Sequence, residues 1–541
     1  MSTLTWTPDA PGELLPGWRA ADVAAADAAR LATGVDLMAV AAHALAGRCA
    51  ALLRERAGGV SGRAVVLLVG PGNNGGDALL AGASLRRRGA GVTALLLADR
   101  AHEGGVAGLR AAGGRVIRPH PDDEADLHHA ADLVRDADLV VDGVLGIGAR
   151  GAVRGAAHDL LERVALRGGA VVACDLPSGL DPDTGALSGP VLPADVTVTF
   201  GAAKAGLLLP RGRHVVGELV VVDLGLEEHL PDPALHLVRD GGAPDLPGPH
   251  VAVRWPRPWR DADKYARGVL GVAAGDDRYP GAAVLACSAA AASGVGMVRY
   301  VPADGRAAAV DPVGPLVLRA VPELLVQPLA DVGRVQAWVV GPGVSEPDDP
   351  RVRHVLEEAD EPAVVDAGAL QAAARLTREG TLRRPDRLLL TPHRGELERV
   401  AGVLGLERRE DAVDTARDVV ARTGAVVLLK GADTVVLTPE GRTTVVPGGP
   451  PWLATAGAGD VLAGVAGALL AAGTAPGRAA TLAAHVHAVA AHRASRGGPL
   501  HAALVADEVR GVVADALGAR VPGEGLASGG APVLWDDGAR D

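Results

Sequence analysis

The stretch RAVVLLVGPGNNGGDALLAG, residues 63–82, joins an apolar run to a segment rich in glycine and asparagine. The run 64–69 is short, continuous and made of Ala, Val and Leu, as expected of a parallel strand buried on both faces. Residues from 78 onward have a helical pattern. A buried strand, a glycine-rich turn and a helix form the βα unit of an α/β protein, in which ligands bind at the carboxyl ends of strands.

Length and composition limit the classes of protein to which the chain can belong. Its 541 residues exceed one ordinary hydrophobic core and predict two or three domains. A net charge of −12 without a basic block excludes a protein that tracks nucleic-acid phosphates. Cys49, Cys174 and Cys287 lack metal-ligand spacing, which predicts buried thiols in a reducing compartment. The N-terminus lacks a signal-peptide pattern and no uncharged apolar run has bilayer length, so we expect a soluble, cytoplasmic protein.

Apolar runs alternate with Ala-rich helical segments along most of the chain, which predicts two α/β domains, the first of them with a parallel sheet. The second set of runs ends in a hairpin-like pair, TVVLTPEGRTTVV, at 434–446. We expect domains at 1–228 and 263–520, a Pro-rich linker at 229–262, and a disordered tail at 521–541, where Gly, Pro and Asp outnumber residues that can pack.

Polar residues follow three predicted strands of the first domain. They belong to the segments 70–77, 142–151 and 175–180. Glycines allow a backbone to approach an anion, a helix N-terminus offers unpaired N–H groups, and Asn and Asp oxygens suit a hard cation. Because the carboxyl ends of parallel strands meet at one edge of a sheet, we expect a phosphate-bearing ligand beside a cation there.

The second domain has its own set of polar strand ends. In TAGAGDVLAGVAGALLAAG, residues 455–473, small residues leave the N–H groups of 456–459 free to face a phosphoryl group, and Asp460 is placed to accept a hydroxyl proton. Lys430 and Gly431 end one predicted strand, and TPHRGE, with His393, follows another. This pattern indicates a phosphoryl-transfer site with an attached base.

The first set of motifs, GPGNNGGD, VVDGVLGIGARG, ACDLPSGLDPDTG and ADVTVTFGAAKAGLL, resembles the NAD(P)H-hydrate epimerase domain over most of residues 15–226. The resemblance implies a Rossmann-like fold, with Asp175 facing the reacting ring as the proton-transfer group. It also implies a potassium ion held by Asn74, Asp142 and Ser178. The hydrate-binding residues that it implies are Asn73, Asn74, Gly75, Gly76, Asp77, Gly146, Ile147, Gly148, Ala149, Arg150, Gly151, Ala152 and Asp175.

The second set, KYARGVLGVAAGDDRYPGAAVLACSAAAASGVGMV, WVVGPGV, VVDAGAL and TPHRGE, with the GAGD string, is similar to the ADP/ATP-dependent NAD(P)H-hydrate dehydratase. This resemblance implies a ribokinase-like α/β fold and ADP or ATP as co-substrate, with Mg²⁺. The hydrate contacts that it implies are Ala282, Gly343, His393 and Asp460. The nucleotide contacts that it implies are Lys430, Gly431, Ala432, Asp433, Thr434 and Gly459.

Together the resemblances imply one function, the repair of hydrated NADH and NADPH. The first domain would interconvert the R and S hydrates, and the second would dehydrate the S form, with Asp460 as base. Two alternatives remain. In the first alternative, the N-terminal domain is a non-catalytic nucleotide-binding module, which Ala39 and Val40 favour because they stand where the epimerase family has Glu and Asn. In the second, the C-terminal domain is a small-molecule kinase of the ribokinase class. Association into a homo-oligomer is compatible with either.

Overall fold

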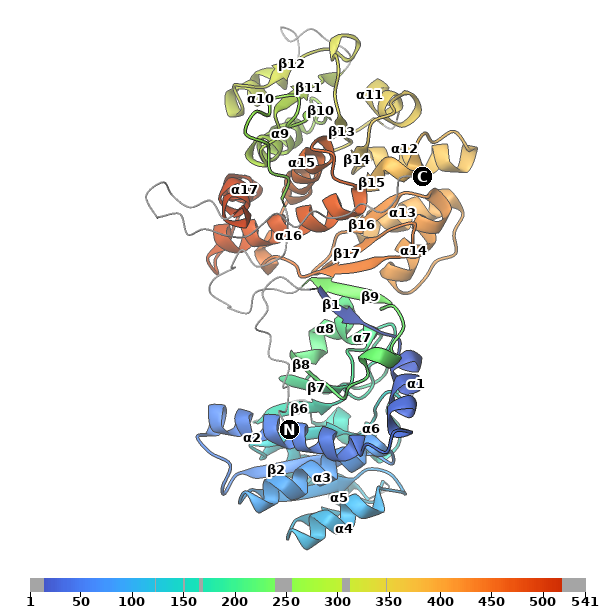
Figure 1. Cartoon of the computed structure of the whole chain (residues 1–541), viewed down its shortest axis with the longest axis vertical. Coiled ribbons are helices and arrows are strands. Elements are labelled where there is room, and N and C mark those ends of the chain that lie inside the picture. Colours follow the sequence, from blue (N-terminus) through green and yellow to red (C-terminus); the bar gives the residue numbers. More distant parts are fainter. Residues whose placement is uncertain are drawn as a thin grey trace.

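The protein is described here by a computed structural model that covers residues 14–121, 123–148, 151–164, 169–238, 255–303, 312–346 and 348–517. These residues form two α/β units, one above the other in Figure 1. The predicted tail, 521–541, lies outside the described residues, as does the part of the predicted linker from 239 to 254.

The N-terminal unit contains a seven-stranded sheet in the order β4-β3-β2-β5-β6-β7-β8, and all of its neighbouring strands are parallel. This confirms the prediction of a parallel sheet. The strands are β2 (Ala64–Val69), β3 (Gly91–Leu96), β4 (Arg115–Ile117), β5 (Leu139–Gly143), β6 (Ala170–Cys174), β7 (Val196–Phe200) and β8 (Glu218–Val222). The helices are α1 (Ala20–Leu31), α2 (Leu37–Ala57), α3 (Asn73–Arg87), α4 (Glu103–Ala111), α5 (Glu124–Arg135), α6 (Ala156–Arg163), α7 (Ala205–Leu208) and α8 (Pro210–Val216).

The order of these strands fixes where a ligand can bind. From β2 the chain moves outward through β3 to β4, and then returns to the other side of β2 through β5 and β6. Crossover helices on either side of such a switch point leave a crevice at the carboxyl ends of the two central strands. The motifs after β2, β5 and β6 therefore meet at this edge of the sheet.

The structure corrects one local expectation. The NNGGD segment is not a loop, because α3 begins at Asn73 with Gly72 as its N-cap, and the segment is the first turn of that helix. Glycine is required at this turn: a Cβ on Gly75 would lie 2.3 Å from the carbonyl oxygen of Gly70. The helix therefore starts directly against the end of β2, and its unpaired N–H groups point into the crevice.

Helix α2 is the one helix in the described part of the chain that is long and apolar enough for a membrane span. Half of its most apolar window is buried inside the protein, where it packs on α3, β6 and β7. A core helix passes the same test of length and hydropathy. Cys49 lies on its buried side, and Cys174 and Cys287 are likewise buried and free, as predicted.

The C-terminal unit contains an eleven-stranded sheet in the order β1-β9-β18-β17-β16-β15-β14-β13-β10-β11-β12. Its strands are β1 (Leu14–Gly17), β9 (Leu235–Val238), β10 (Val269–Ala273), β11 (Met297–Tyr300), β12 (Leu325–Val326), β13 (Ala337–Val340), β14 (Ala363–Val365), β15 (Leu388–Leu390), β16 (Val426–Leu429), β17 (Thr434–Leu437) and β18 (Thr443–Val446). The strands from β10 to β16 run parallel to one another, whereas β16 pairs antiparallel with β17, and β17 and β18 form the predicted antiparallel hairpin.

Helices cover both faces of this sheet, and short turns of 3-10 or π-helix join several elements. The helices are α9 (Pro280–Ala292), α10 (Gly314–Ala320), α11 (Pro350–Arg353), α12 (Gly368–Glu379), α13 (Arg394–Leu404), α14 (Ala412–Thr423), α15 (Ala458–Ala471), α16 (Pro476–Ser495) and α17 (Ala502–Ala516). The most buried is α15, which packs on α9 so closely that a Cβ on Gly464 would lie 2.3 Å from the carbonyl oxygen of Ala286.

The expected domain boundaries need correction, because two strands cross them. β1, from the start of the chain, pairs antiparallel with β9, and β9 pairs parallel with β18 of the second domain. Figure 1 shows β1 and β9 between the two units. Residues 235–238 were expected in a linker without regular structure, but Leu235, Leu237 and Val238 are buried. The edge of β18 offers them unpaired backbone groups and an apolar surface, which explains why this stretch forms a strand.

Candidate functional site

A cavity of about 660 Å³ lies at the switch point of the N-terminal sheet, between α1, α2 and the ends of β2, β5 and β6. Of the residues predicted to contact a hydrate in this domain, those lining the cavity are Asn73, Asn74, Asp77, Gly146, Ile147, Gly148 and Asp175. Gly75 and Gly76 lie behind them in the first turn of α3. Gly151 and Ala152 do not line the cavity, and Ala149 and Arg150 lie outside the described residues.

Asp175 is held by a lysine that comes from a later strand end. Lys204, which follows β7, places its Nζ 2.6 Å from Oδ1 of Asp175, and the side chain of Lys204 is only 1% exposed. Thr199 donates a further hydrogen bond from Oγ1 to the same oxygen, at 3.1 Å. Asp175 has a φ of +66°, a conformation that non-glycine residues rarely adopt. The backbone therefore carries strain at the residue predicted to move the proton.

Asp77 faces this pair with one oxygen unpaired. Its Oδ1 is buried and has no hydrogen-bond partner within the described part of the chain. Burial, with the charges of Asp175 and Asp36, raises the pKa of Asp77 to about 8. Burial also raises the pKa of Asp27, which lines the cavity from α1. At neutral pH Asp77 is thus mostly protonated and able to donate a hydrogen bond to a ligand.

The three residues expected to hold a cation are linked through hydrogen bonds, with Asn74 and Ser178 both bonded to the backbone of Leu145 and Ser178 bonded to Asp142. Ser178 donates from Oγ to Oδ1 of Asp142 at 2.6 Å, and its Oγ accepts from the N–H of Leu145. Asn74 donates from Nδ2 to the carbonyl oxygen of Leu145, which leaves its Oδ1 available. Asp142 is fully buried, its pKa is raised by burial, and no ion pair in the described residues includes it. Oxygen donors around a buried carboxylate without a countercharge fit a hard cation such as K⁺.

The second domain has a comparable cluster, formed at the ends of β14, β15 and β16. Lys430 places Nζ 2.8 Å from Oδ1 of Asp366 and 3.6 Å from Oε2 of Glu396. Burial acts to lower the pKa of Lys430, but the two carboxylates outweigh it and raise that pKa. The same oxygen of Asp366 accepts a hydrogen bond from Thr391. A charged lysine is therefore fixed at the carboxyl edge of the sheet.

Asp460 completes this cluster from the first turn of α15. Burial, with the charges of Asp366 and Glu396, raises the pKa of Asp460 to about 7, although Lys430 acts in the opposite direction. The glycine before it in the turn brings the helix start close: a Cβ on Gly459 would lie 3.3 Å from Nζ of Lys430. A carboxyl group with a pKa near 7, beside a lysine and a helix N-terminus, suits a general base for phosphoryl transfer.

His393 and the two remaining predicted hydrate contacts lie at other strand ends. His393 caps α13, accepting from the N–H of Gly395 at Nδ1, while Glu396 accepts from the N–H of His393. Ala282 and Gly343 are neighbours: a Cβ on Gly343 would lie 2.6 Å from the Cβ of Ala282. They lie beyond the carboxyl ends of the neighbouring strands β10 and β13. The chain leaves these two strands in opposite directions along the sheet, so this point is the switch point of the second sheet.

The predicted nucleotide contacts 430–434 form the turn between β16 and β17. Both carboxylate oxygens of Asp433 in this turn already accept a hydrogen bond from the protein. Its Oδ2 accepts from Nε of Arg213 at 2.8 Å, and its Oδ1 accepts from the N–H of Gly448. Lys430 and Gly459 lie together, as the resemblance implies, but Asp433 is engaged by the N-terminal domain.

The sequence interpretation missed Lys204, Asp27, Asp36 and Asp366 as site residues. Lys204 and Asp366 each carried a signal, since Asp366 directly follows an apolar strand, in VVDAG, and Lys204 comes four residues after the end of one, in FGAAK. Asp27 and Asp36 carried none, because they belong to helical and turn segments that lie far from the glycine-rich motifs in the sequence.

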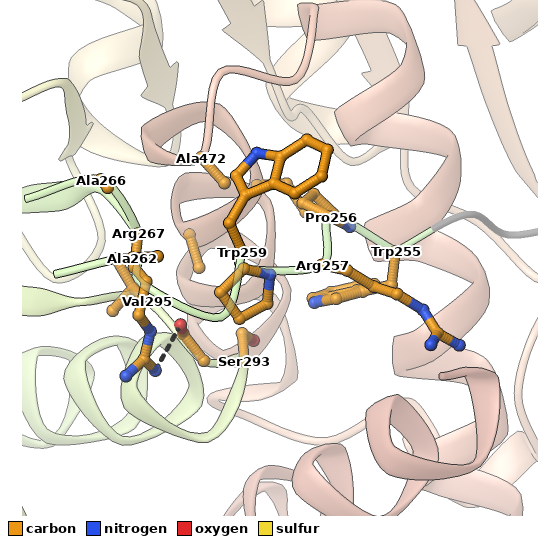
Figure 2. A pocket seen from close by; sticks show the side chains of 14 residues that line it. Trp255, Pro256, Arg257, Trp259, Ala262, Ala266, Arg267, Ser293, Val295 and Ala472 are labelled. Carbon is orange, nitrogen blue, oxygen red and sulfur yellow. Dashed lines mark hydrogen bonds between the residues drawn. The ribbon is translucent and has the colours of Figure 1, made fainter. Parts of the chain in front are cut away.

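A separate, smaller cavity of about 170 Å³ lies between the segment 255–267 and the ends of α9 and α15 (Figure 2). Trp259, which is 84% exposed, stands over it, and Arg267 donates to the carbonyl oxygen of Gly294 at its rim. Ala472, at the far end of α15, lies about 18 Å along the helix from Asp460. This cavity is therefore not part of the phosphoryl-transfer cluster.

Comparison with known proteins adds independent evidence. A family model described as NAD(P)H-hydrate dehydratase matches residues 270–507, and one described as YjeF-related protein N-terminus matches residues 34–206. The NAD(P)H-hydrate epimerase of Clavibacter michiganensis is 48% identical over 225 residues, which are 40% of this chain and 94% of that protein. The ADP/ATP-dependent NAD(P)H-hydrate dehydratase of Bacillus subtilis, co-crystallised with ATP/Mg²⁺, is 30% identical, covers 49% of this chain and 95% of its own, and has a TM-score of 0.42.

Relatives that contain both domains match along most of the chain. The bifunctional NAD(P)H-hydrate repair enzyme of Mycobacterium leprae is 41% identical over 474 residues, which are 87% of this chain and 91% of that protein. The corresponding enzyme of Mycobacterium tuberculosis is 42% identical over 463 residues, covering 85% and 89%. The two domain matches and the full-length relatives agree with the motifs at both sheet edges, and the chain belongs to the family of bifunctional NAD(P)H-hydrate repair enzymes.

Proposed function

We propose that the cavity around Asp175 is the epimerase site of this enzyme and that the cluster around Asp460 is its dehydratase site. The observation that carries the proposal is Asp460 itself, a carboxyl group with a pKa of about 7 at a helix N-terminus, beside the fixed ammonium group of Lys430. A base of that pKa is half deprotonated at neutral pH, where proton transfer is most efficient.

In the dehydratase site, the hydrate carries a hydroxyl group at C6 of its nicotinamide ring, and hydroxide is a poor leaving group. Asp460 accepts the proton of that hydroxyl group while the hydroxyl oxygen of the hydrate attacks the terminal phosphorus of ADP or ATP. The bond between that phosphorus and the rest of the nucleotide breaks, and the shortened nucleotide leaves. Phosphate then leaves C6, and loss of a proton from the neighbouring ring carbon restores the double bond. The N–H groups at the start of α15 hold the charge that develops on the phosphoryl oxygens.

In this proposal the nucleotide contacts Gly459 and residues 430–434, and it binds together with Mg²⁺. Within the described residues no group of three His, Cys, Asp or Glu side chains is placed to hold a metal. The ion therefore fits as one bound mainly by phosphate oxygens and water, which is how Mg²⁺ is held in most phosphoryl-transfer sites. When bound, it neutralises phosphate charge.

In the epimerase site, inversion at C6 requires one bond of this hydroxyl-bearing carbon to break and then to form again on the other face of the carbon. Asp175 moves the proton that this exchange needs, and Lys204 orients its carboxylate. The protonated Asp77, which also lines the cavity, donates a hydrogen bond to the hydrate. The first turn of α3 provides N–H groups for the phosphates of the nucleotide.

A potassium ion at Asn74, Asp142 and Ser178 fits this site. The fully buried carboxylate of Asp142 supports the assignment, because it has hydrogen-bond donors but, among the residues that the structure describes, no cationic side chain to balance it. The ion supplies positive charge beside the start of α3. The hydrogen bond from the N–H of Leu145 to Oγ of Ser178 fixes the segment after β5 relative to the carboxylate of Asp142.

One assay tests both halves of the proposal. A mixture of R and S hydrates is incubated with ADP or ATP, and recovery of reduced-nicotinamide absorbance is followed. The parent enzyme converts the whole mixture, an Asp175→Asn variant stops when the S fraction is consumed, and an Asp460→Asn variant recovers almost no reduced nicotinamide in the same time. Full conversion by either variant contradicts the role of the residue changed. A stable phosphorylated product, in place of recovered NADH, would indicate a kinase.

A further inference from the structure

The N-terminal domain contacts the nucleotide turn of the second domain through one charged pair. Arg213 of α8 places Nε 2.8 Å from Oδ2 of Asp433, which lies 220 residues further along the chain in the turn between β16 and β17. The side chains are 32% and 12% exposed, so the pair is partly shielded from water. A shielded pair with a short contact holds its geometry better than an exposed surface pair.

Asp433 connects that contact to the shape of the turn. Its second oxygen accepts a hydrogen bond from the N–H of Gly448, at 3.1 Å. The backbones meet closely here, since a Cβ on Gly448 would lie 1.5 Å from the carbonyl oxygen of Ala432. Asp433 therefore fixes the turn 430–433 against the segment after β18, and Lys430 at the start of the turn is fixed at its other end by Asp366.

The segment that carries Arg213 also begins at the epimerase site. Lys204, the partner of Asp175, is the N-cap of α7, and α8 follows α7 directly. The two short helices are packed without a gap: a Cβ on Gly212 would lie 1.9 Å from the carbonyl oxygen of Gly206. One compact segment thus extends from the epimerase lysine to the nucleotide turn of the other domain.

We propose that Arg213 is a positioning residue for the nucleotide site of the dehydratase domain, supplied by the epimerase domain and acting through Asp433. The inference rests on the proposed nucleotide site at 430–434. Arg213 has two effects on that site. It holds the turn in place, and it neutralises a carboxylate that would otherwise repel the phosphates of ADP or ATP. The dehydratase domain of this chain therefore depends on its fused partner for full nucleotide affinity.

The test uses the full-length enzyme, pure S hydrate and steady-state kinetics with ADP or ATP varied. We expect Arg213→Ala to raise the nucleotide KM by about fivefold or more, the usual range for coupling between sites, with kcat and the hydrate KM unchanged. Arg213→Lys restores part of the affinity because it keeps the charge. The matched control is Arg211→Ala on the same helix, whose contacts to Glu410 and Asp411 are longer and do not involve the turn.

A double-mutant cycle separates positioning from direct binding and from misfolding. In an Asp433→Asn background, Arg213→Ala should add nothing to the nucleotide KM. An equal effect in both backgrounds, an effect on kcat alone, or no effect in either would overturn the inference. Lys430→Ala tests the proposed nucleotide site separately. If this variant leaves the nucleotide KM unchanged, the nucleotide site is misplaced. If it raises the nucleotide KM while Arg213→Ala leaves it normal, the site stands and only the inference about Arg213 is wrong.

Discussion

The Nζ of Lys204 lies 2.6 Å from Oδ1 of Asp175, and both side chains are almost completely removed from water. The second domain repeats the relationship, with Nζ of Lys430 at 2.8 Å from Oδ1 of Asp366. In both domains the aspartate directly follows a buried parallel strand, and the lysine follows another strand of the same sheet. A buried ion pair adds little net stability, but it makes each partner costly to remove.

We expect Lys204→Met to abolish epimerisation and to lower the free energy of unfolding of the N-terminal domain by about 3–5 kcal/mol, because it leaves the carboxylate of Asp175 buried without a countercharge. Dehydration of pure S hydrate should persist wherever the second domain remains folded. Chemical denaturation and the two separate activity assays measure these effects.

The double variant Asp175→Asn with Lys204→Met distinguishes a chemical role from a structural one. It removes both charges, so stability should return to near that of the parent while epimerisation remains absent. Recovery of epimerase activity along with stability would show that the pair is structural only.

Asp460→Asn keeps the shape of the side chain but cannot accept a proton. The dehydration rate should fall by about 10² to 10⁴, while adenine-nucleotide affinity and epimerisation are retained, because Lys430 and the start of α15 are unchanged. Stopped assays with pure S hydrate and nucleotide titration measure the two quantities. A variant within about threefold of the parent rate, less than 1 kcal/mol of barrier, contradicts the role of Asp460 as base.

The dehydration rate should rise with pH up to about 7 and level off above it, because Asp460 must be deprotonated to act and its pKa is raised to about 7. Glu396→Gln removes one of the charges that raise this pKa, so the midpoint should move to lower pH, and Gln preserves the helix cap at His393. An unmoved midpoint would indicate another titrating group. Because the native state holds this proton more tightly than the unfolded chain, the same group lowers the free energy of unfolding as pH rises from about 4 to about 7.

If the proposed cation site holds K⁺, Asp142→Ala should weaken hydrate binding in the epimerase and make epimerisation independent of K⁺, without changing dehydration of pure S hydrate. The reason is that Asp142 is the only carboxylate in the expected cation set, and it lies in the other domain from Asp460. Epimerisation rates measured in K⁺ and in an equal concentration of a large organic cation provide the comparison. Equal loss of both activities would mean that the variant is unfolded or the site misassigned.

A fragment that begins at Pro249 should be less stable than one that begins at Pro231, since only the longer one retains β9 against β18. The loss should reach at least about 2 kcal/mol, the contribution of one fully buried Leu or Val, because Leu235, Leu237 and Val238 are all buried. Urea unfolding followed by tryptophan fluorescence measures the difference. Equal midpoints would show that the second domain does not need this strand.

The sequence by itself determined the α/β class of both domains, the parallel sheet of the first, the hairpin at 434–446 and the polar residues at the strand ends. These features depend on local pattern: continuous apolar runs of strand length, glycines before helices, and charged residues at fixed offsets from them. For the same reason Asp175, Asp460 and the NNGGD segment could be named as candidate site residues before any contact was known.

Only the tertiary structure decided which of these residues meet. Lys204 and Asp175 are 29 residues apart, and Lys430 and Asp366 are 64 apart, so their contacts depend on the order of strands in each sheet and on the crossover helices between them. The joining of β1 and β9 to β18, and the pairing of Arg213 with Asp433, depend on how the domains pack. No local pattern encodes such contacts, because they form between surfaces that the separate segments present only once folded.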